Sequence, residues 1–114
     1  FDEETARTLT NVVVRNERQF SSEIVPGVVL PHVRLAGLPG PVLMVGVSRE
    51  GIVFPRAREP ARLVFLLVSP AERAEEHLRT LAEIARLLSA PGRARELLAR
   101  YAPETELDWL HVDD

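Results

Sequence analysis

The sequence predicts an α/β fold, specifically a three-layer α/β/α sandwich in which helices flank a small mixed sheet. Segments with helical periodicity lie at both ends of the chain, and short apolar segments bounded by glycine and proline lie between them. One central segment, residues 62–69, is apolar almost without interruption, which is typical of a strand covered on both faces. A length of 114 residues suits one core, so we expect a single domain over residues 1–114.

The first element is a helix predicted over residues 3–18. Asp2 can cap its N-terminus, and Glu3 and Glu4 lie favourably in its first turn. Its apolar residues recur at helical spacing and form one stripe, made of Ala6, Leu9, Val12 and Val13.

Four short strands are expected in the middle of the chain. They are Gly27–Leu30, Val42–Ser48, Ile52–Phe54 and the central strand at 62–69. The glycines and prolines within residues 33–42 predict a loop, and the sequence REG at 49–51 predicts a turn.

Three further helices are expected to complete the fold. Ser69, Pro70 and Glu72 have the spacing of a capping box, so a helix is predicted from there to about Leu88. A second helix is expected to open at Pro91 and to run through Tyr101. A third is expected to open at Pro103 and to carry Leu107, Trp109 and Leu110.

Composition argues against several functional classes. The net charge of −3 gives no electrostatic footprint for nucleic acid or an anionic membrane. The chain has no cysteine, so it can form neither a disulfide nor a thiolate zinc site. The longest apolar run, Leu63–Val68, is far shorter than the roughly 20 residues of a membrane-spanning helix, so we expect no direct membrane insertion.

Two histidines are the strongest candidates for chemistry. His32 follows Pro31 at the predicted exit of an apolar strand, where rigid scaffolds often present reactive groups. His77 lies on the apolar side of the helix predicted after the central strand. From the residues alone, both histidines could instead be structural. No metal-ligand spacing is present, but the two histidines and an acid such as Glu23 or Glu76 could still meet in space.

Three stretches together carry a resemblance to a known family. They are FSSEIVPGVVLPHVR, VLMVGVSREGIVF and RLVFLLVSPAERAEEHLRTLAEIARLL. In this order they resemble the type 2 enzyme IIA domain of the bacterial phosphoenolpyruvate-dependent sugar phosphotransferase system, the mannitol, fructose and nitrogen-regulatory class. The resemblance covers about residues 15–100, and it implies a fold like that of enzyme IIA type 2.

The resemblance implies roles for individual residues. His32 corresponds to the histidine that accepts a phosphoryl group from an HPr-type phosphocarrier protein, and His77 to a second histidine that supports the phosphorylated state. Ser22 stands where the family usually has threonine near the active site. Apart from the resemblance, Arg34 is a further candidate to hold the phosphoryl group, and the alternative is an arginine in a solvated loop. No metal or organic cofactor is expected. The implied partners are the phosphocarrier and a downstream acceptor domain or transporter, in the cytoplasm.

The sequence also departs from the family. Glu23 and Val25 stand where hinge glycines are usual, and a carboxylate beside a phosphoryl group would repel it. The family's opening strand and helix are largely absent before Phe1, so we expect a domain that lacks part of its N-terminus or was cut from a longer chain. A second hypothesis is therefore a regulatory enzyme IIA-like domain attached to a membrane transporter, without efficient phosphotransfer. A third is a small hydrolase or metal-binding domain that uses His32 and His77.

Overall fold

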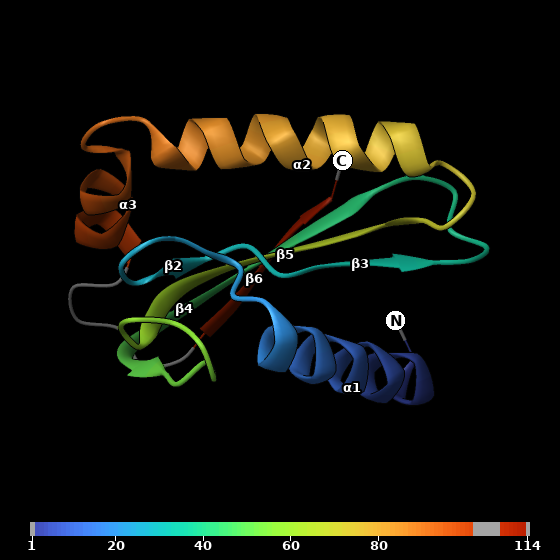
Figure 1. Cartoon of the computed structure of the whole chain (residues 1–114), viewed down its shortest axis with the longest axis horizontal. Coiled ribbons are helices and arrows are strands. Elements are labelled where there is room, and N and C mark those ends of the chain that lie inside the picture. Colours follow the sequence, from blue (N-terminus) through green and yellow to red (C-terminus); the bar gives the residue numbers. More distant parts are fainter. Residues whose placement is uncertain (1, 102–107, 114) are drawn as a thin grey trace.

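The computed structural model of the chain describes residues 2–101 and the backbone of residues 108–113, and its elements form three layers (Figure 1). Helix α1 (Glu3–Gln19) lies along one face of a mixed sheet. Helices α2 (Ala74–Ser89) and α3 (Arg93–Tyr101) lie along the other face. The predicted three-layer α/β/α sandwich is therefore confirmed, and α1 and α3 lie close to their predicted positions.

Within the described residues, the sheet has six strands with β5 at its centre. The strands are β1 (Glu23–Val25), β2 (Val28–Val29), β3 (His32–Leu35), β4 (Val42–Ile52), β5 (Ala61–Pro70) and β6 (Asp108–Asp113). Strand β5 is parallel to β2 and β3 and antiparallel to β4, whose other edge carries β6. The predicted central strand is thus confirmed, because β5 has neighbours on both edges and helices over both faces.

Alternate residues of β5 face the two helical layers. Leu63 packs with Leu88 on the side of α2 and α3, whereas Val68 packs with Leu9 of α1 on the opposite side. All four side chains are buried. Odd-numbered positions of β5 near its C-terminal end therefore point toward α2, and this alternation decides which residues of the neighbouring strands share that face.

The chain before His32 forms a hairpin instead of the single strand predicted over Gly27–Leu30. Val28 and Val29 form β2, and Gly27 lies in the turn from β1 with a φ of 88°, which glycine adopts without steric strain. The loop predicted over 33–42 is also wrong at its start, because residues 32–35 form β3. The reason is tertiary: β5 extends past its contact with β2 and offers its backbone to a second parallel strand.

Strand β4 is longer than predicted. It passes through residues 49–51 without the predicted turn, so the separate strand predicted at Ile52–Phe54 is wrong. Ile52 pairs with Ala61 after a register shift, and Gly51 supplies a φ of 93° within the irregular part. The chain reverses later, at residues 53–60, which we call the β4–β5 loop.

The capping box predicted at Ser69 does not form. Strand β5 continues through Ser69 and Pro70 because both pair with β3, and α2 consequently begins only at Ala74. The Glu72 carboxylate instead accepts a hydrogen bond of 3.2 Å from the backbone N–H of Gly37. Pairing with a neighbouring strand has outweighed a local capping signal.

The predicted last helix is wrong where the structure describes it. Residues 108–113 form β6, antiparallel to β4, whereas Pro103 and Leu107 lie outside the described residues. The edge of β4 offers backbone hydrogen bonds along residues 42–47, and these outweigh the local helical pattern around Trp109.

Candidate functional site

Two histidines from different layers of the fold lie side by side. His32 is the first residue of β3, and His77 lies in the first turns of α2. Their ring centroids are 5.4 Å apart, and the ring planes are inclined by 45°. The register of β3 aligns His32 with Leu67 of β5, which places the His32 side chain on the sheet face that α2 covers. The structure therefore brings together the two histidines that the sequence singled out.

His32 is the exposed member of the pair. Its Nδ1 lies 3.4 Å from the backbone oxygen of Leu30. A carbonyl oxygen can only accept, so Nδ1 carries the proton in this contact and Nε2 keeps its lone pair. Pro31 is buried and restricts the backbone directly before the ring. This contact therefore leaves Nε2 as the ring nitrogen with a free lone pair.

His77 is the buried member of the pair, with 5% of its surface exposed. Burial lowers the pKa of His77, and the nearby His32 and Arg34 lower it further. His77 is therefore neutral at pH 7 and has one ring N–H to donate. Its Nδ1 is buried without a hydrogen-bond partner among the described residues. A buried polar atom in this state, next to an exposed imidazole, is a candidate to bind a ligand.

Ser22 also lies beside His32. Both residues line a small cavity of about 140 Å³, whose wall is formed by the end of α1 and the segment that follows it. The Ser22 hydroxyl is buried, and it has no hydrogen-bond partner within the part of the chain that the structure describes. The hydroxyl is thus free to contact a group bound at His32.

Arg34 lies two residues beyond His32 in β3, so its side chain is on the same face of the sheet. Arg34 is exposed, and its positive charge is near enough to His77 to lower the pKa of that imidazole. Arg34 therefore belongs to strand β3 beside the two histidines, and the alternative of a solvated loop arginine is wrong.

Glu17 is a residue of the site that sequence reasoning missed. Its side chain is 4% exposed, it lines the His32 cavity, and its carboxylate accepts a hydrogen bond of 3.1 Å from the Ser22 N–H. A signal was present, because Glu17 follows Leu9 and Val13 at intervals of four on the apolar stripe of α1. An acidic residue at a core-facing position indicates a specific partner.

Glu23 does not stand as an unpaired charge at the site. Its carboxylate accepts hydrogen bonds from the Nε and backbone N–H of Arg58 and from the N–H of Glu59, over 3.1–3.3 Å. Burial acts to raise the pKa of Glu23, but these hydrogen bonds and the Arg58 charge outweigh burial and hold the pKa below its ordinary value. The repulsion expected from an unpaired carboxylate is therefore reduced by pairing with Arg58.

No three histidine, cysteine, aspartate or glutamate side chains come together as a metal site among the residues that the structure describes. Both acids considered as ligands have an arginine partner: Glu23 pairs with Arg58 and Glu76 with Arg73. A larger cavity of about 480 Å³ lies between α3 and the β1–β2 turn, but no histidine, serine or carboxylate lines it. The histidine pair is accordingly the candidate site.

The chain matches the family model described as "Phosphoenolpyruvate-dependent sugar phosphotransferase system, EIIA 2" over residues 3–107. The chain belongs to this family. The match confirms the resemblance to the type 2 enzyme IIA domain, and it makes the chain an enzyme IIA-like domain of the phosphotransferase system.

Three curated relatives agree with this membership. The chain is 32% identical over 102 residues to "Nitrogen regulatory protein" of Pseudomonas aeruginosa, covering 89% of this chain and 65% of the relative. It is 27% identical over 101 residues to "PTS system fructose-specific EIIA component" of Haloferax volcanii, covering 88% of this chain and 66% of the relative. It is 25% identical over 103 residues to "PTS system fructose-specific EIIABC component" of Bacillus subtilis, covering 90% of this chain and 16% of that protein. The chain thus spans less than two thirds of the length of each.

A solved structure supports the same fold. The nitrogen regulatory protein IIA-Ntr from Neisseria meningitidis is similar with a TM-score of 0.66 and 28% sequence identity, covering 75% of this chain and 60% of that one.

Among the described residues, no helix is both long and apolar enough to cross a membrane.

Proposed function

We propose that this domain accepts a phosphoryl group on Nε2 of His32 from a phosphocarrier protein and passes it to a downstream acceptor. The observation that carries the proposal is the pairing of an exposed imidazole, His32, with a buried neutral imidazole, His77, at 5.4 Å. A reactive ring that partners can reach and a fixed donor beside it are what phosphoryl transfer needs, because this reaction depends on positioning and charge stabilisation.

The transfer step needs few parts. The lone pair of His32 Nε2 forms a new N–P bond as the bond between phosphorus and the carrier's leaving atom breaks, and the carrier keeps that electron pair. The His32 ring shares the resulting positive charge, and its Nδ1 proton is held by the Leu30 carbonyl. One ring N–H of His77, the Ser22 hydroxyl and the Arg34 guanidinium are the groups that would bind the phosphoryl oxygens.

Family membership supports the proposed partners. The family belongs to a system that passes phosphoryl groups between proteins, so the proposed donor is an HPr-type phosphocarrier in the cytoplasm. The proposed acceptor is a transporter component, since two relatives are named as fructose-specific parts of such a system. No metal or organic cofactor is part of this proposal.

The test is incubation with phosphoenolpyruvate, enzyme I and HPr, followed by intact mass measurement at neutral to alkaline pH. We expect a gain of one phosphoryl group in the wild type and no gain in His32→Ala. The control is His111→Ala, which replaces the third histidine of the chain and should still gain the group. Phosphorus NMR should assign the group to Nε2. A folded wild-type protein that gains no mass contradicts the proposal, and a gain that persists in His32→Ala moves the site elsewhere.

A second candidate is a regulatory domain attached to a transporter, without efficient phosphotransfer. The 32% identity to a protein named for nitrogen regulation favours the regulatory role in this candidate. This candidate predicts that the unphosphorylated domain binds its target as tightly when His32 is replaced by alanine. Equal binding by wild type and His32→Ala, together with phosphoryl transfer far slower than in an active enzyme IIA, would support it over the first.

A further inference from the structure

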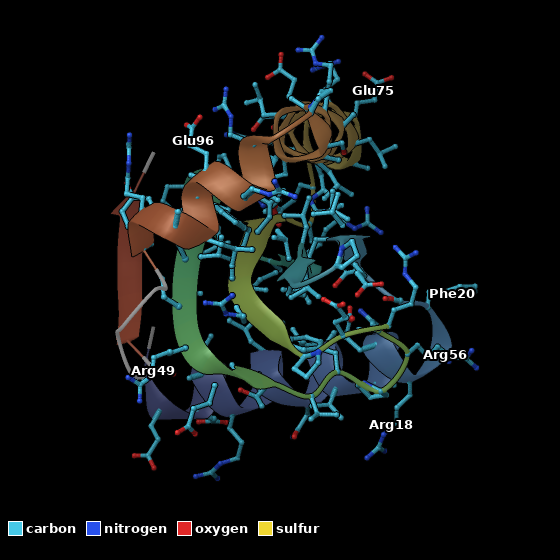
Figure 2. All side chains as sticks on the ribbon, turned by 90° about the vertical axis from the view of Figure 1, so that its left-hand side faces the viewer. Arg18, Phe20, Arg49, Arg56, Glu75 and Glu96 are labelled. Atoms are coloured by element: carbon cyan, nitrogen blue, oxygen red, sulfur yellow. The ribbon has the colours of Figure 1, made fainter. Side chains whose placement is uncertain are left out.

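The β4–β5 loop holds the C-terminal end of α1. Arg56 Nε donates a hydrogen bond of 2.7 Å to the backbone oxygen of Arg18 in the last turn of the helix. The final carbonyls of a helix lack partners within it, and a cation there also interacts favourably with the helix dipole. Figure 2 shows Arg18, Phe20 and Arg56 at the same edge of the molecule. The contact joins two segments 38 residues apart in the sequence.

The same loop holds the start of β1. The carboxylate of Glu23 accepts hydrogen bonds from the Arg58 side chain and from the backbone N–H groups of Arg58 and Glu59. The Glu23 side chain is 6% exposed, whereas Arg58 is 73% exposed. A buried carboxylate with a charged donor and backbone donors is strongly held, because its alternative is an unpaired buried charge.

The β4–β5 loop is itself ordered by packing. Phe54 packs against a buried cluster that contains Val29 and Val64, and the Ala57 N–H donates a hydrogen bond to the Phe54 oxygen. At the base of the loop, a Cβ on Gly51 would stand 2.6 Å from Pro60, so the chain is closely packed there. The loop is therefore anchored to the core and can serve as a fixed support for both of its arginines.

The Arg56 contact with Arg18 and the Arg58 contact with Glu23 lie on either side of one short segment. Residues 19–22 follow Arg18 and precede Glu23, and all four of them line the cavity that contains His32. Inside the segment, the backbone of Ser22 is held by Glu17 and by the Leu30 N–H, which donates to the Ser22 oxygen over 2.9 Å. The loop adds a fixed point at each end of this cavity wall.

We propose that Arg56 and Arg58 are positioning residues for phosphoryl acceptance, because they hold residues 19–22 in place and thereby keep the Ser22 hydroxyl beside His32. This inference rests on the proposed function of His32. Neither arginine lines the cavity, so both act through the wall and not on the phosphoryl group. Misplacement of a site group by about 1 Å can slow a reaction by up to about a hundredfold, which sets the scale of the effect.

The test compares the variant Arg56→Ala/Arg58→Ala with the conservative variant Arg56→Lys/Arg58→Lys. In the alanine variant we expect the transfer rate at saturating phosphocarrier to fall between about tenfold and about a hundredfold, with a much smaller change in KM for the carrier. Hydrogen exchange at the Ser22 amide, which donates to Glu17, should become faster. The lysine variant keeps cationic donors at both positions and should recover most of the rate.

The matched control is Arg49→Ala. Arg49 is exposed on β4 and lies away from Arg18 and Arg56 in the view of Figure 2, so its loss should change neither rate nor exchange. The inference is overturned if the folded alanine variant matches the wild type in rate and in exchange, or if the lysine variant is as slow as the alanine variant. If the wild type itself accepts no phosphoryl group, the proposed function fails, while amide exchange still decides whether the arginines hold the wall.

Discussion

The ring centroids of His32 and His77 lie 5.4 Å apart, yet His32 is exposed whereas His77 is buried, with 5% of its surface exposed. This asymmetry separates their roles. A partner protein can reach only the ring at the surface, whereas the buried ring has a fixed position and a lowered pKa. In the proposed function, His32 is therefore the acceptor and His77 the neutral hydrogen-bond donor.

Replacement of His77 should slow phosphoryl acceptance without abolishing it. His77→Ala removes one donor to the phosphoryl oxygens, and loss of one such donor typically lowers a rate by about a hundredfold or more. His77→Gln keeps an N–H donor and should lose less. Time-resolved mass measurement with a saturating carrier gives both rates, and a His77→Ala protein as fast as the wild type would remove His77 from the mechanism.

The pKa of His77 should rise in Arg34→Ala. Burial is the largest cause of the lowered pKa and remains in the variant, so the value should move toward 6.5 without reaching it. Proton NMR titration of the imidazole in both proteins measures the shift. An unchanged or lower pKa in Arg34→Ala would show that the guanidinium does not act on this ring.

The same lowered pKa predicts how stability depends on pH. The unfolded chain binds a proton on His77 near pH 6.5, whereas the folded chain resists this proton until lower pH. The free energy of unfolding should therefore fall as the pH decreases below about 6.5, until the folded pKa is passed. Urea unfolding of the wild type and His77→Gln across this range tests the sign, because the variant should lack this contribution.

Glu17 should support the cavity wall. In Glu17→Ala the half-buried N–H of Ser22 loses its acceptor, which typically costs about 1 kcal/mol or more of stability. Glu17→Gln keeps an acceptor oxygen and should lose less. Urea unfolding measures both, and Glu3→Ala on the exposed side of α1 is the control. Equal stability of Glu17→Ala and wild type would contradict the anchoring role.

Phe20 should contact the phosphocarrier. It is 79% exposed and lines the His32 cavity, so a protein that delivers a phosphoryl group to His32 must approach it closely. We expect Phe20→Ala to raise KM for the carrier by about fivefold or more, as is typical when an interface aromatic is truncated. Transfer from a small phosphoramidate donor should be unchanged. Leu87→Ala, an exposed apolar residue near the far end of α2, is the control, and equal KM values in both variants would place the interface elsewhere.

Much of the site was readable from the sequence because its residues carry distinctive chemistry. His32 and His77 lie in stretches that resemble a family, and the resemblance predicted that they share one site. Only the structure gives the distance between their rings. Glu17 was missed because a single acidic residue in a helix is ordinary; its place on the apolar stripe of α1 was the one sequence signal, and burial in the structure shows what that place means. The partner of Glu23 could not be foreseen, since Arg58 belongs to a distant loop.

The sequence by itself determined the helices with strong amphipathic stripes and the central position of β5, because both are properties of local apolar patterning. Tertiary structure alone decided where strands begin and end. Residues 32–35, Ser69 with Pro70, and 108–113 became strands because neighbouring strands offered unpaired backbone groups to them. Those same pairings set His32 on the face beneath α2, so the histidine pair depends on hydrogen bonds between segments distant in sequence.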